Sequence, residues 1–321
     1  MHKRLLVEGV LDFSIIPKGP ILVKSGSESP DPTRPDMEFV RTRHGTLGET
    51  VYIPGSSLKG VFRSYAERVV RTIKGDNGCC NPLNKESFCG DNKELKEYKK
   101  DGNTPELYNK SCVICKTFGS TLLASHIGFR DAYPTPEKVK ETNQTEERTG
   151  VAIDRVTGGA AKRALFNLET VTKGEFKTNI YLKNFELWQI GLFGIALRDI
   201  KHGLVRIGFG KARGLGEVEI KINNLLIRYF GTQIKENGLE LLGRNTTLPI
   251  VENSSTNFYG VGKLSIDEPS YGFDPEDSTK VDKFLKSESD TFTVSFQLSD
   301  EECMALLKAC AEVNLKRKLG V

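Results

Sequence analysis

The stretch that decides the fold of the first half of this chain is YIPGSSLKGVFRS, residues 52–64. Its proline and the glycine after it end an apolar strand and permit a tight turn, since proline cannot continue a β-ladder and glycine tolerates unusual backbone angles. Ser56 or Ser57 is then a natural N-cap for a helix. Apolar side chains recur every four residues up to Ile73, which predicts an amphipathic helix over about residues 57–73.

The same stretch carries cations that a helix can align. Lys59 and Arg63 are four residues apart and therefore share a helical face. Together with free backbone N–H groups near Ser56 and Ser57, they form a pattern suited to gripping a phosphate backbone. The alternative is an ordinary capped helix whose basic edge faces water. The stretch is not a Walker A loop, because the first glycine of that motif and its spacing are absent.

The remaining segments alternate between strands and helices and predict an α+β fold. Their order, β-α-β…β-α-β, is that of a ferredoxin-like or RRM-like sheet with large insertions. Residues 252–290 are rich in serine, asparagine and aspartate and are expected to be a linker or a peripheral element. The expected strands are 3–16, 126–132, a hairpin within 151–183, 216–222 and 291–298, and the expected helices are 57–73, 187–204 and a segment with a capping box formed by Ser299 and Glu302.

Charge is distributed unevenly along the 321 residues, although the formal net charge is only +4. Residues 59–74, 148–183 and 198–213 each carry a net charge of +4, whereas residues 267–302 carry −8. Such asymmetry suits a protein whose first two thirds face a polyanion. The alternative is that the charged residues belong to solvated helix and loop faces.

Nothing in the sequence indicates a membrane-spanning or exported protein. The longest apolar run, residues 187–197, includes Gln189, and a bilayer span needs about 20 apolar residues. Glu8 and Asp12 fall where a signal peptide needs an uninterrupted apolar run. We therefore expect a cytoplasmic protein.

Cysteines cluster in a polar insertion at residues 75–115, which holds five of the seven. In a cytoplasmic protein such a cluster indicates a metal site or a redox pair rather than disulfides. The insertion has too little apolar content to fold without a staple, which favours structural zinc over reduced buried thiols. The expected ligands are Cys112 and Cys115 of a CxxC pair, with Cys89 and with Cys80 or, alternatively, Cys79.

Four segments together resemble the RAMP superfamily, the repeat-associated proteins of CRISPR effector complexes. They are GSSLKGVFR, CVICKTFG, GVAIDRVTGGAAKRALF and RIGFGKARGLGEVEI, which begin at residues 55, 112, 150 and 206. The first and third are the most specific. The resemblance covers about residues 1–225 and points to the backbone subunits of type III effector complexes. From about residue 226 onward the chain matches no pattern of that family.

The resemblance implies a division of the chain into two parts. Residues 1–230 would form the RAMP domain, which contains an RRM-like palm, the zinc-binding insertion at 75–115 and a thumb β-hairpin at 145–183. Residues 231–321 would be an extension that ends in a strand and a helix.

The resemblance also implies that the chain binds a CRISPR guide RNA and a complementary target RNA. Its other partners would be the backbone, cap, large and small subunits of the effector complex. The thumb would kink the guide at regular intervals, with Val151, Ile153, Leu165 and Phe166 as apolar wedges between bases. The residues expected to contact RNA are Ser56, Ser57, Lys59, Arg63, Arg155, Lys162, Arg163, Lys211 and Arg213.

In active members of the family, an aspartate in the loop before GSSLKG cleaves the target RNA with a divalent metal, Mg2+ or Mn2+. The family pattern is an aspartate followed five residues later by an arginine, which Asp36 and Arg41 fit, with Asp31 as the competitor. We therefore expect a metal-dependent endoribonuclease in which Asp36 is catalytic. His44 is the histidine of this loop that could serve as a general base. The usual His-x-Gly after the first strand is replaced by residues 21–26.

Other interpretations stay open at this point. Asp36 could be a turn residue whose carboxylate caps a backbone N–H, and the chain would then be a catalytically inactive, structural guide-binding subunit. A stand-alone guide-processing endoribonuclease is a further alternative. The thumb segment and the lack of a well-placed histidine argue against it.

Overall fold

A computed structural model describes residues 3–26, 33–236, 238–244, 246–252, 254–265 and 271–321. In that part of the chain the largest sheet is antiparallel and has seven strands, in the order β16-β17-β9-β1-β8-β4, with β5 also paired to β8. The strands are β1 Val7–Pro17, β4 Ile127–Phe129, β5 Tyr133–Pro134, β8 Phe176–Lys183, β9 Val218–Phe230, β16 Ser287–Asp290 and β17 Thr293–Leu298.

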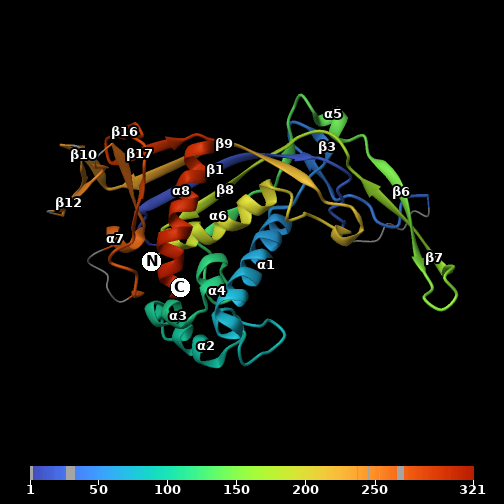
Figure 1. Cartoon of the computed structure of the whole chain (residues 1–321), viewed down its shortest axis with the longest axis horizontal. Helices are drawn as coiled ribbons and strands as arrows, with labels where there is room; N and C mark the ends of the chain where they lie inside the picture. Colours follow the sequence, from blue (N-terminus) through green and yellow to red (C-terminus); the bar gives the residue numbers. More distant parts are fainter. Residues whose placement is uncertain (1–2, 27–32, 237, 245, 253, 266–270) are drawn as a thin grey trace.

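Helices cover one face of this sheet (Figure 1). They are α1 Gly55–Lys74, α6 Leu187–Lys201 and α8 Asp300–Ala309, the last continued by a π-helical turn, Cys310–Leu315, and by α9 Lys316–Leu319. In β1 the side chains of Leu11, Phe13 and Ile15 are buried against the helices, while Val10 and Asp12 on the other face stay partly exposed. The predicted α+β fold and its β-α-β…β-α-β order are confirmed, as is the capping box of Ser299 and Glu302.

Helix α6 is apolar almost all round because it lies between α1 and the C-terminal helix. Two glycines allow that close approach. A Cβ on Gly191 would lie 2.7 Å from the backbone carbonyl carbon of Cys310, and one on Gly194 would lie 2.7 Å from the Cβ of Leu307. Side chains at either position would force the two helices apart.

The predicted N-cap of α1 is wrong. The helix begins at Gly55 and its N-cap is Pro54, which has no side chain able to accept a hydrogen bond. The carboxylate of Asp131 takes that place, because its Oδ1 accepts the Gly55 N–H at 2.7 Å. Ser56 and Ser57 therefore lie in the first turn. A Cβ on Gly55 would collide with the backbone that follows β4, so glycine is required there.

The extension is folded, including most of the stretch expected to be a linker or a peripheral element. Its buried Asp277 connects it to α6, because Oδ1 accepts the Leu187 N–H at 2.9 Å. Within the extension, Oδ2 accepts the Gly262 N–H at 3.1 Å. Burial and the neighbouring Glu186 raise the pKa of Asp277 to about 8. The extension's other elements are β10 Thr232–Lys235, β11 Gly238–Leu241, β12 Thr246–Pro249, β13 Val251–Glu252, β14 Ser255–Tyr259, α7 Val261–Leu264 and β15 Ser278–Val281.

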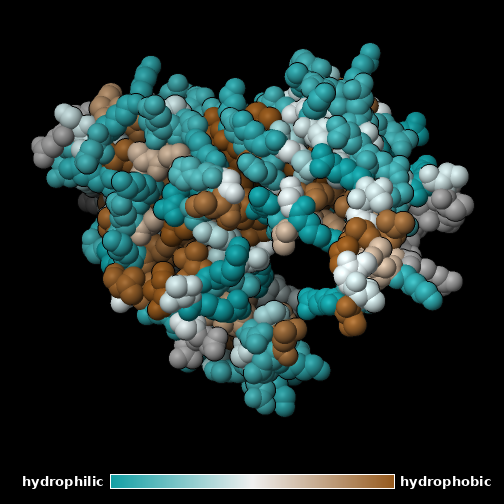
Figure 2. Space-filling view, turned by 45° about the vertical axis from the view of Figure 1, so that its right-hand side comes forward, coloured by the Kyte–Doolittle hydropathy of each residue, from teal (hydrophilic) through white to brown (hydrophobic). Residues whose placement is uncertain are grey.

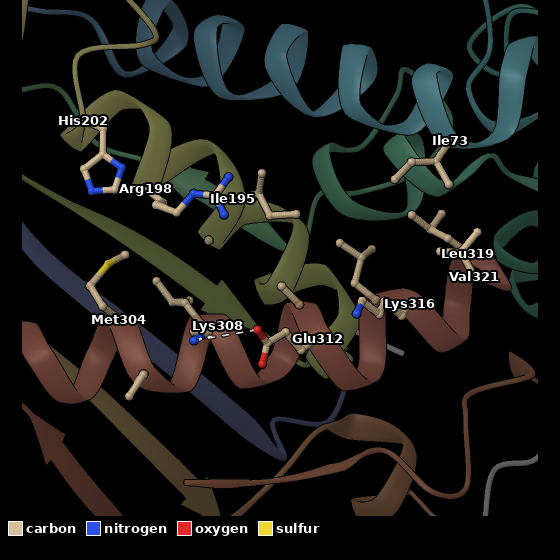
Figure 3. Close-up of a pocket in the computed structure, with 15 residues that line it drawn as sticks. Ile73, Ile195, Arg198, His202, Met304, Lys308, Glu312, Lys316, Leu319 and Val321 are labelled. Carbon is tan, nitrogen blue, oxygen red and sulfur yellow. Dashed lines mark ion pairs between the residues drawn. The ribbon is translucent and has the colours of Figure 1, made fainter. Parts of the chain in front are cut away.

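The C-terminal helix also forms one wall of an apolar groove of about 600 Å3, shown in Figure 3. Ile73 of α1, Ile195 of α6 and Leu319 of α9 contribute to its apolar lining. Arg198 and Lys316 also line it. β17 pairs with β9 of the central sheet and α8 packs in the same hydrophobic core, so the groove lies between the first 230 residues and the C-terminal helix.

The remaining elements are insertions between the core strands and helices. The hairpin of β6 and β7 projects from the body of the molecule (Figure 1). The sequence predicted a hairpin within residues 151–183, but the last part of that region forms β8, which joins the central sheet instead of the hairpin. No helix in the described ranges is long and apolar enough to cross a membrane. The insertions contain β2 Arg41–His44, β3 Gly48–Val51, a 3-10 turn Gly75–Gly78, α2 Lys93–Lys100, α3 Thr104–Lys110, α4 Val113–Phe118, α5 Val139–Thr142, β6 Glu146–Ile153, β7 Ala160–Thr170 and a 3-10 turn Lys211–Arg213.

Candidate nucleic-acid interface and metal centre

Three segments that are far apart in sequence meet around residues 20–25. The Val40 N–H donates to the Val23 carbonyl at 2.9 Å, and the Phe209 N–H donates to the Leu22 carbonyl at 2.7 Å. The C-terminal end of β7 and the same segment exchange two backbone hydrogen bonds of 2.9 Å. The loop before β2, the glycine-rich loop of residues 206–216 and the root of the β6–β7 hairpin are therefore held side by side.

Asp36 lies at this junction, exposed to solvent. Its Oδ2 accepts the backbone N–H of Asn167 at 2.8 Å. The next residue, Met37, pairs in parallel with Leu168 of β7. Among the described residues, none hydrogen-bonds to the other carboxylate oxygen of Asp36. One oxygen of the carboxylate is thus held by a hydrogen bond, and the other has no hydrogen-bond donor among the described residues. Asp31 lies outside the described residues.

Arg41 fits the family spacing but pairs with another acid. Its guanidinium forms a close ion pair with Glu169 of β7. Glu169 also accepts the Phe39 N–H at 2.8 Å and the Thr145 hydroxyl at 2.7 Å. The ion pair of Arg41 with Glu169 therefore holds the loop against the hairpin, and Arg41 does not pair with Asp36.

The β6–β7 hairpin exposes apolar side chains that nothing in the described chain covers. Val151 is 45% exposed, Ile153 57% and Leu165 70%. Figure 2 shows this apolar surface on the projecting arm. Arg155 and Lys162 are exposed on the same hairpin. The side chain of Arg163 lies outside the described part of the structure.

Phe166, the fourth predicted wedge, is placed differently. Its ring covers Gly150 across the hairpin, where a Cβ would collide with it. The guanidinium of Arg213 lies 5.5 Å from the Phe166 ring centre and 5.0 Å from that of Phe209. Arg213 therefore bridges the glycine-rich loop and the hairpin root by cation–π contacts. Nearby, partial burial and then the charge of Arg68 lower the pKa of Lys211.

Arg63 has a structural role that its four-residue spacing from Lys59 did not indicate. It donates to the Gly119 carbonyl at 2.9 Å, to Glu67 at 3.1 Å and to the sulfur of Cys115 at 3.5 Å. The guanidinium thus ties α1 to the cysteine-rich insertion. Burial, followed by the charge of Arg63, lowers the pKa of Lys59 on the same helical face. Lys59 forms no ion pair with any described residue.

The insertion brings four of its cysteines together. The sulfurs of Cys80, Cys89, Cys112 and Cys115 all lie within 4.8 Å of one another, and those of Cys80 and Cys115 are 3.7 Å apart. Tetrahedral zinc with Zn–S bonds of about 2.3 Å needs sulfurs roughly 3.8 Å apart, so the donor set and its spacing fit this ion. Hydrogen bonds from the Cys115 thiol and from the other cysteines lower the pKa of the Cys112 thiol, which favours a thiolate.

Cys79 is not part of this cluster. Its side chain packs into the main core, whereas Cys80 packs with the apolar residues of the insertion. Arg71 donates to the Cys79 sulfur at 3.3 Å. The structure therefore selects Cys80 over its neighbour as the fourth member of the group.

The profile of the RAMP superfamily matches residues 15–219. The chain belongs to the RAMP superfamily. Two similar proteins carry the description "CRISPR system Cms endoribonuclease Csm3": one from Methanocaldococcus jannaschii, 28% identical over 192 residues, and one from Methanothermobacter thermautotrophicus, 27% identical over 206 residues. These matches span 66% and 69% of the relatives and 56% and 55% of this chain. The RAMP match ends at β9, before the extension.

The sequence did not reveal two acids that hold α1 and the loop before β2 in position. Asp131 caps α1 from 76 positions away, and Glu169 binds Arg41 from 128 positions away. Neither belongs to a spacing pattern, so no local signal could have found them. His44 was considered as a base. Its ring instead packs 4.6 Å from that of Tyr133, and no described contact joins it to Asp36.

Proposed function

We propose that this chain is a guide-RNA-binding backbone subunit of a type III CRISPR effector complex and that it cleaves complementary target RNA at regular intervals. It would work in the cytoplasm with guide RNA, target RNA and other effector subunits. Membership of the RAMP superfamily and the likeness to two proteins named as endoribonucleases support this assignment.

The observation that carries the cleavage proposal is the position of Asp36. It is an exposed carboxylate, open at one oxygen, at the junction of the loop, the hairpin root and the glycine-rich loop. RNA seated along the hairpin and the cations Arg155, Lys162 and Lys211 would pass beside it. A carboxylate with a free oxygen is a suitable ligand for Mg2+ or Mn2+, with phosphate and water as further oxygen donors.

RNA carries its own nucleophile, so the protein needs to supply little covalent chemistry. In the proposed reaction a target 2′-hydroxyl attacks the adjacent phosphorus and the 5′-oxygen leaves, which requires a distorted, in-line backbone. The hairpin would impose that distortion by inserting Val151 and Ile153 between bases. A divalent ion, when bound, would stabilise the charge that develops on the phosphate. Asp36 would hold that ion or accept the proton.

The alternative is a structural guide-binding subunit without cleavage. The ion pair of Arg41 with Glu169 supports it, because Asp36 then has no adjacent free guanidinium. The assembled complex with Mg2+ and a complementary RNA separates the two. Cuts at regular spacing support the nuclease, and target RNA that is bound but left intact supports the structural subunit.

We also propose that Cys80, Cys89, Cys112 and Cys115 bind structural zinc. The ion would cross-link the small apolar core of the insertion, in which Leu95, Leu107 and Leu123 pack with the cysteines. Arg63 would connect the folded insertion to α1 through its hydrogen bonds to Cys115 and Gly119.

Lys59 and Lys211 are expected to grip phosphates without reading sequence. Lys59→Glu or Lys211→Glu should weaken binding of unrelated single-stranded RNAs about equally and reduce the salt slope of log K by roughly one unit per contact. Lys286→Glu, an exposed lysine of the extension, is the matched control. Fluorescence anisotropy at several salt concentrations measures both quantities. A loss confined to one RNA sequence would contradict a backbone grip.

Replacing Val151, Ile153 and Leu165 together by serine is expected to abolish regularly spaced protection of the guide. The three side chains are largely exposed, so the fold should lose no more than about 1 kcal/mol. Nuclease footprinting of the assembled complex reads the spacing, and thermal unfolding checks the fold. Phe284→Ser, an exposed apolar residue of the extension, should leave the footprint unchanged. An unaltered period in the triple variant would rule out the wedge.

A further inference from the structure

The apolar groove of about 600 Å3 runs between α1 and the C-terminal helix, which comprises residues 300–319, with α6 between them (Figure 3). Neither the proposed RNA contacts nor the cysteine cluster uses the residues that line it. The wall formed by the C-terminal helix lies outside the residues that match the RAMP superfamily. The groove is therefore a feature of this chain's extension rather than of the matched domain.

The apolar part of the lining is aliphatic. Ile73 is 40% exposed, and Ile195 and Met304 are partly exposed. No phenylalanine, tyrosine or tryptophan is among the lining residues in the described part of the chain. Proteins bind the bases of single strands mainly by stacking them on aromatic rings, so this lining is suited to the aliphatic side chains of a polypeptide rather than to nucleic acid.

The shape of the groove favours a helical ligand. Along the C-terminal helix its lining includes Met304, Lys308, Ala311, Leu315 and Leu319. These positions recur every three or four residues and therefore share one face of the helix. At 1.5 Å per residue that face is about 22 Å long, which matches about four turns of a second helix. An amphipathic helix packs in such a groove through apolar side chains at the same spacing.

The charged residues that line the groove are mostly basic. Arg198, Lys308 and Lys316 line it, and Glu312 is the one acid among its described lining residues. Lys308 pairs with Glu312 at 3.8 Å, and Arg198 pairs with Asp199 at 2.7 Å. Lys316 is exposed and forms no ion pair with a described residue. The groove therefore carries positive charge that the described chain leaves uncompensated.

This charge lies at the end of the groove next to Ile73 and Leu319 (Figure 3). The Nζ of Lys74 lies 3.5 Å from the place that a Cβ on Gly320 would occupy, so Lys74 reaches the same end as Lys316. Lys74 is also exposed and forms no ion pair in the described ranges. Carboxylates at this end would be attracted, and a basic ligand would be repelled.

We propose that this groove binds an acidic amphipathic helix of another protein. Its leucine, isoleucine or methionine side chains pack between α1 and the C-terminal helix, and its carboxylates lie beside Lys74 and Lys316. The inference goes beyond the proposed function and does not depend on it, because the ligand is a polypeptide and the surface is separate from the proposed RNA contacts.

The test uses the full chain and two synthetic helices of about 16 residues, each held helical by a hydrocarbon staple. Both carry leucines at i, i+3, i+4 and i+7 spacing, with glutamate at the other positions in one and lysine in the other. Fluorescence anisotropy at about 0.15 M salt should show that the glutamate helix binds at least about tenfold more tightly. The same glutamate composition with scrambled leucines should bind at least about tenfold more weakly, since it lacks an apolar face.

Variants of the chain locate the binding. Ala311→Phe, which adds bulk in the groove, and Ile73→Ser, which removes an exposed apolar contact, should each weaken binding of the glutamate helix about tenfold or more. Thermal unfolding checks that both variants fold. Lys316→Glu should also weaken it about tenfold, whereas Lys286→Glu, the same charge change outside the groove, should not. None of these four variants should alter RNA binding.

Equal affinity for the glutamate and lysine helices, or binding that survives both Ala311→Phe and Ile73→Ser, would overturn the proposal. A dimer of the full chain that Ile73→Ser dissociates in analytical ultracentrifugation would assign the groove to a second copy and would also overturn it. So would displacement of the glutamate helix by single-stranded RNA. If the chain neither binds nor cuts RNA but binds the glutamate helix as expected, only the proposed function fails.

Discussion

Asp36→Ala is expected to abolish target-RNA cleavage at the sites governed by this subunit. Loss of a positioned metal ligand or proton acceptor lowers a rate by ~10²–10⁴-fold. Guide and target binding should persist, since a carboxylate beside phosphates contributes repulsion rather than affinity. The measurement is cleavage of a labelled complementary RNA by the assembled complex with Mg2+.

Two controls define the outcome for Asp36. Asp31→Ala should cut normally, and a 2′-deoxy substitution at the cut position should block cleavage as completely as Asp36→Ala. If Asp31→Ala alone is inactive, the catalytic residue of the loop has been misassigned. If neither aspartate matters while RNA is still bound, the chain is a structural subunit.

Loss of the metal is expected to have the largest effect on stability. The purified protein should contain about one equivalent of zinc, absent after Cys112→Ser or Cys115→Ser. The free energy of unfolding should fall by several kcal/mol, because a structural zinc site contributes folding energy directly. Elemental analysis and thermal unfolding provide the two measurements.

Cys79→Ser is the matched control for the zinc prediction. It changes a neighbouring cysteine that lies outside the cluster, so the metal content should stay at one equivalent. Arg63→Gln should keep the metal and lower stability less, since it removes only the hydrogen bonds to Gly119 and Cys115. Freshly purified, reduced protein without any metal would contradict the assignment.

The sequence was sufficient where the signal was local. The four-residue period of α1, the apolar run of α6 and the capping box at Ser299 each predicted an element that the structure contains. The same holds for the CxxC pair, because two sulfurs on one turn are fixed by their spacing alone.

It was insufficient where a distant residue decides the outcome. The N-cap of α1 was misassigned because Asp131 competes successfully with the adjacent serines. Cys80 could not be separated from Cys79, since the two side chains enter different clusters and only the folded backbone determines which. The stretch 252–290 was expected to be a linker or a peripheral element, and its described part contributes to the small sheet of β13, β14 and β15. Its strand partners and the anchor at Asp277 cannot be recognised from a local window of sequence.

The parallel pairing of Met37 with Leu168 has a mechanical consequence. Asp36 is hydrogen-bonded to β7 of the projecting hairpin, and the ion pair of Arg41 with Glu169 holds the same loop against that strand. A displacement of the hairpin root would therefore also displace Asp36. If RNA binds the hairpin as proposed, binding of the strand and positioning of the carboxylate would be coupled.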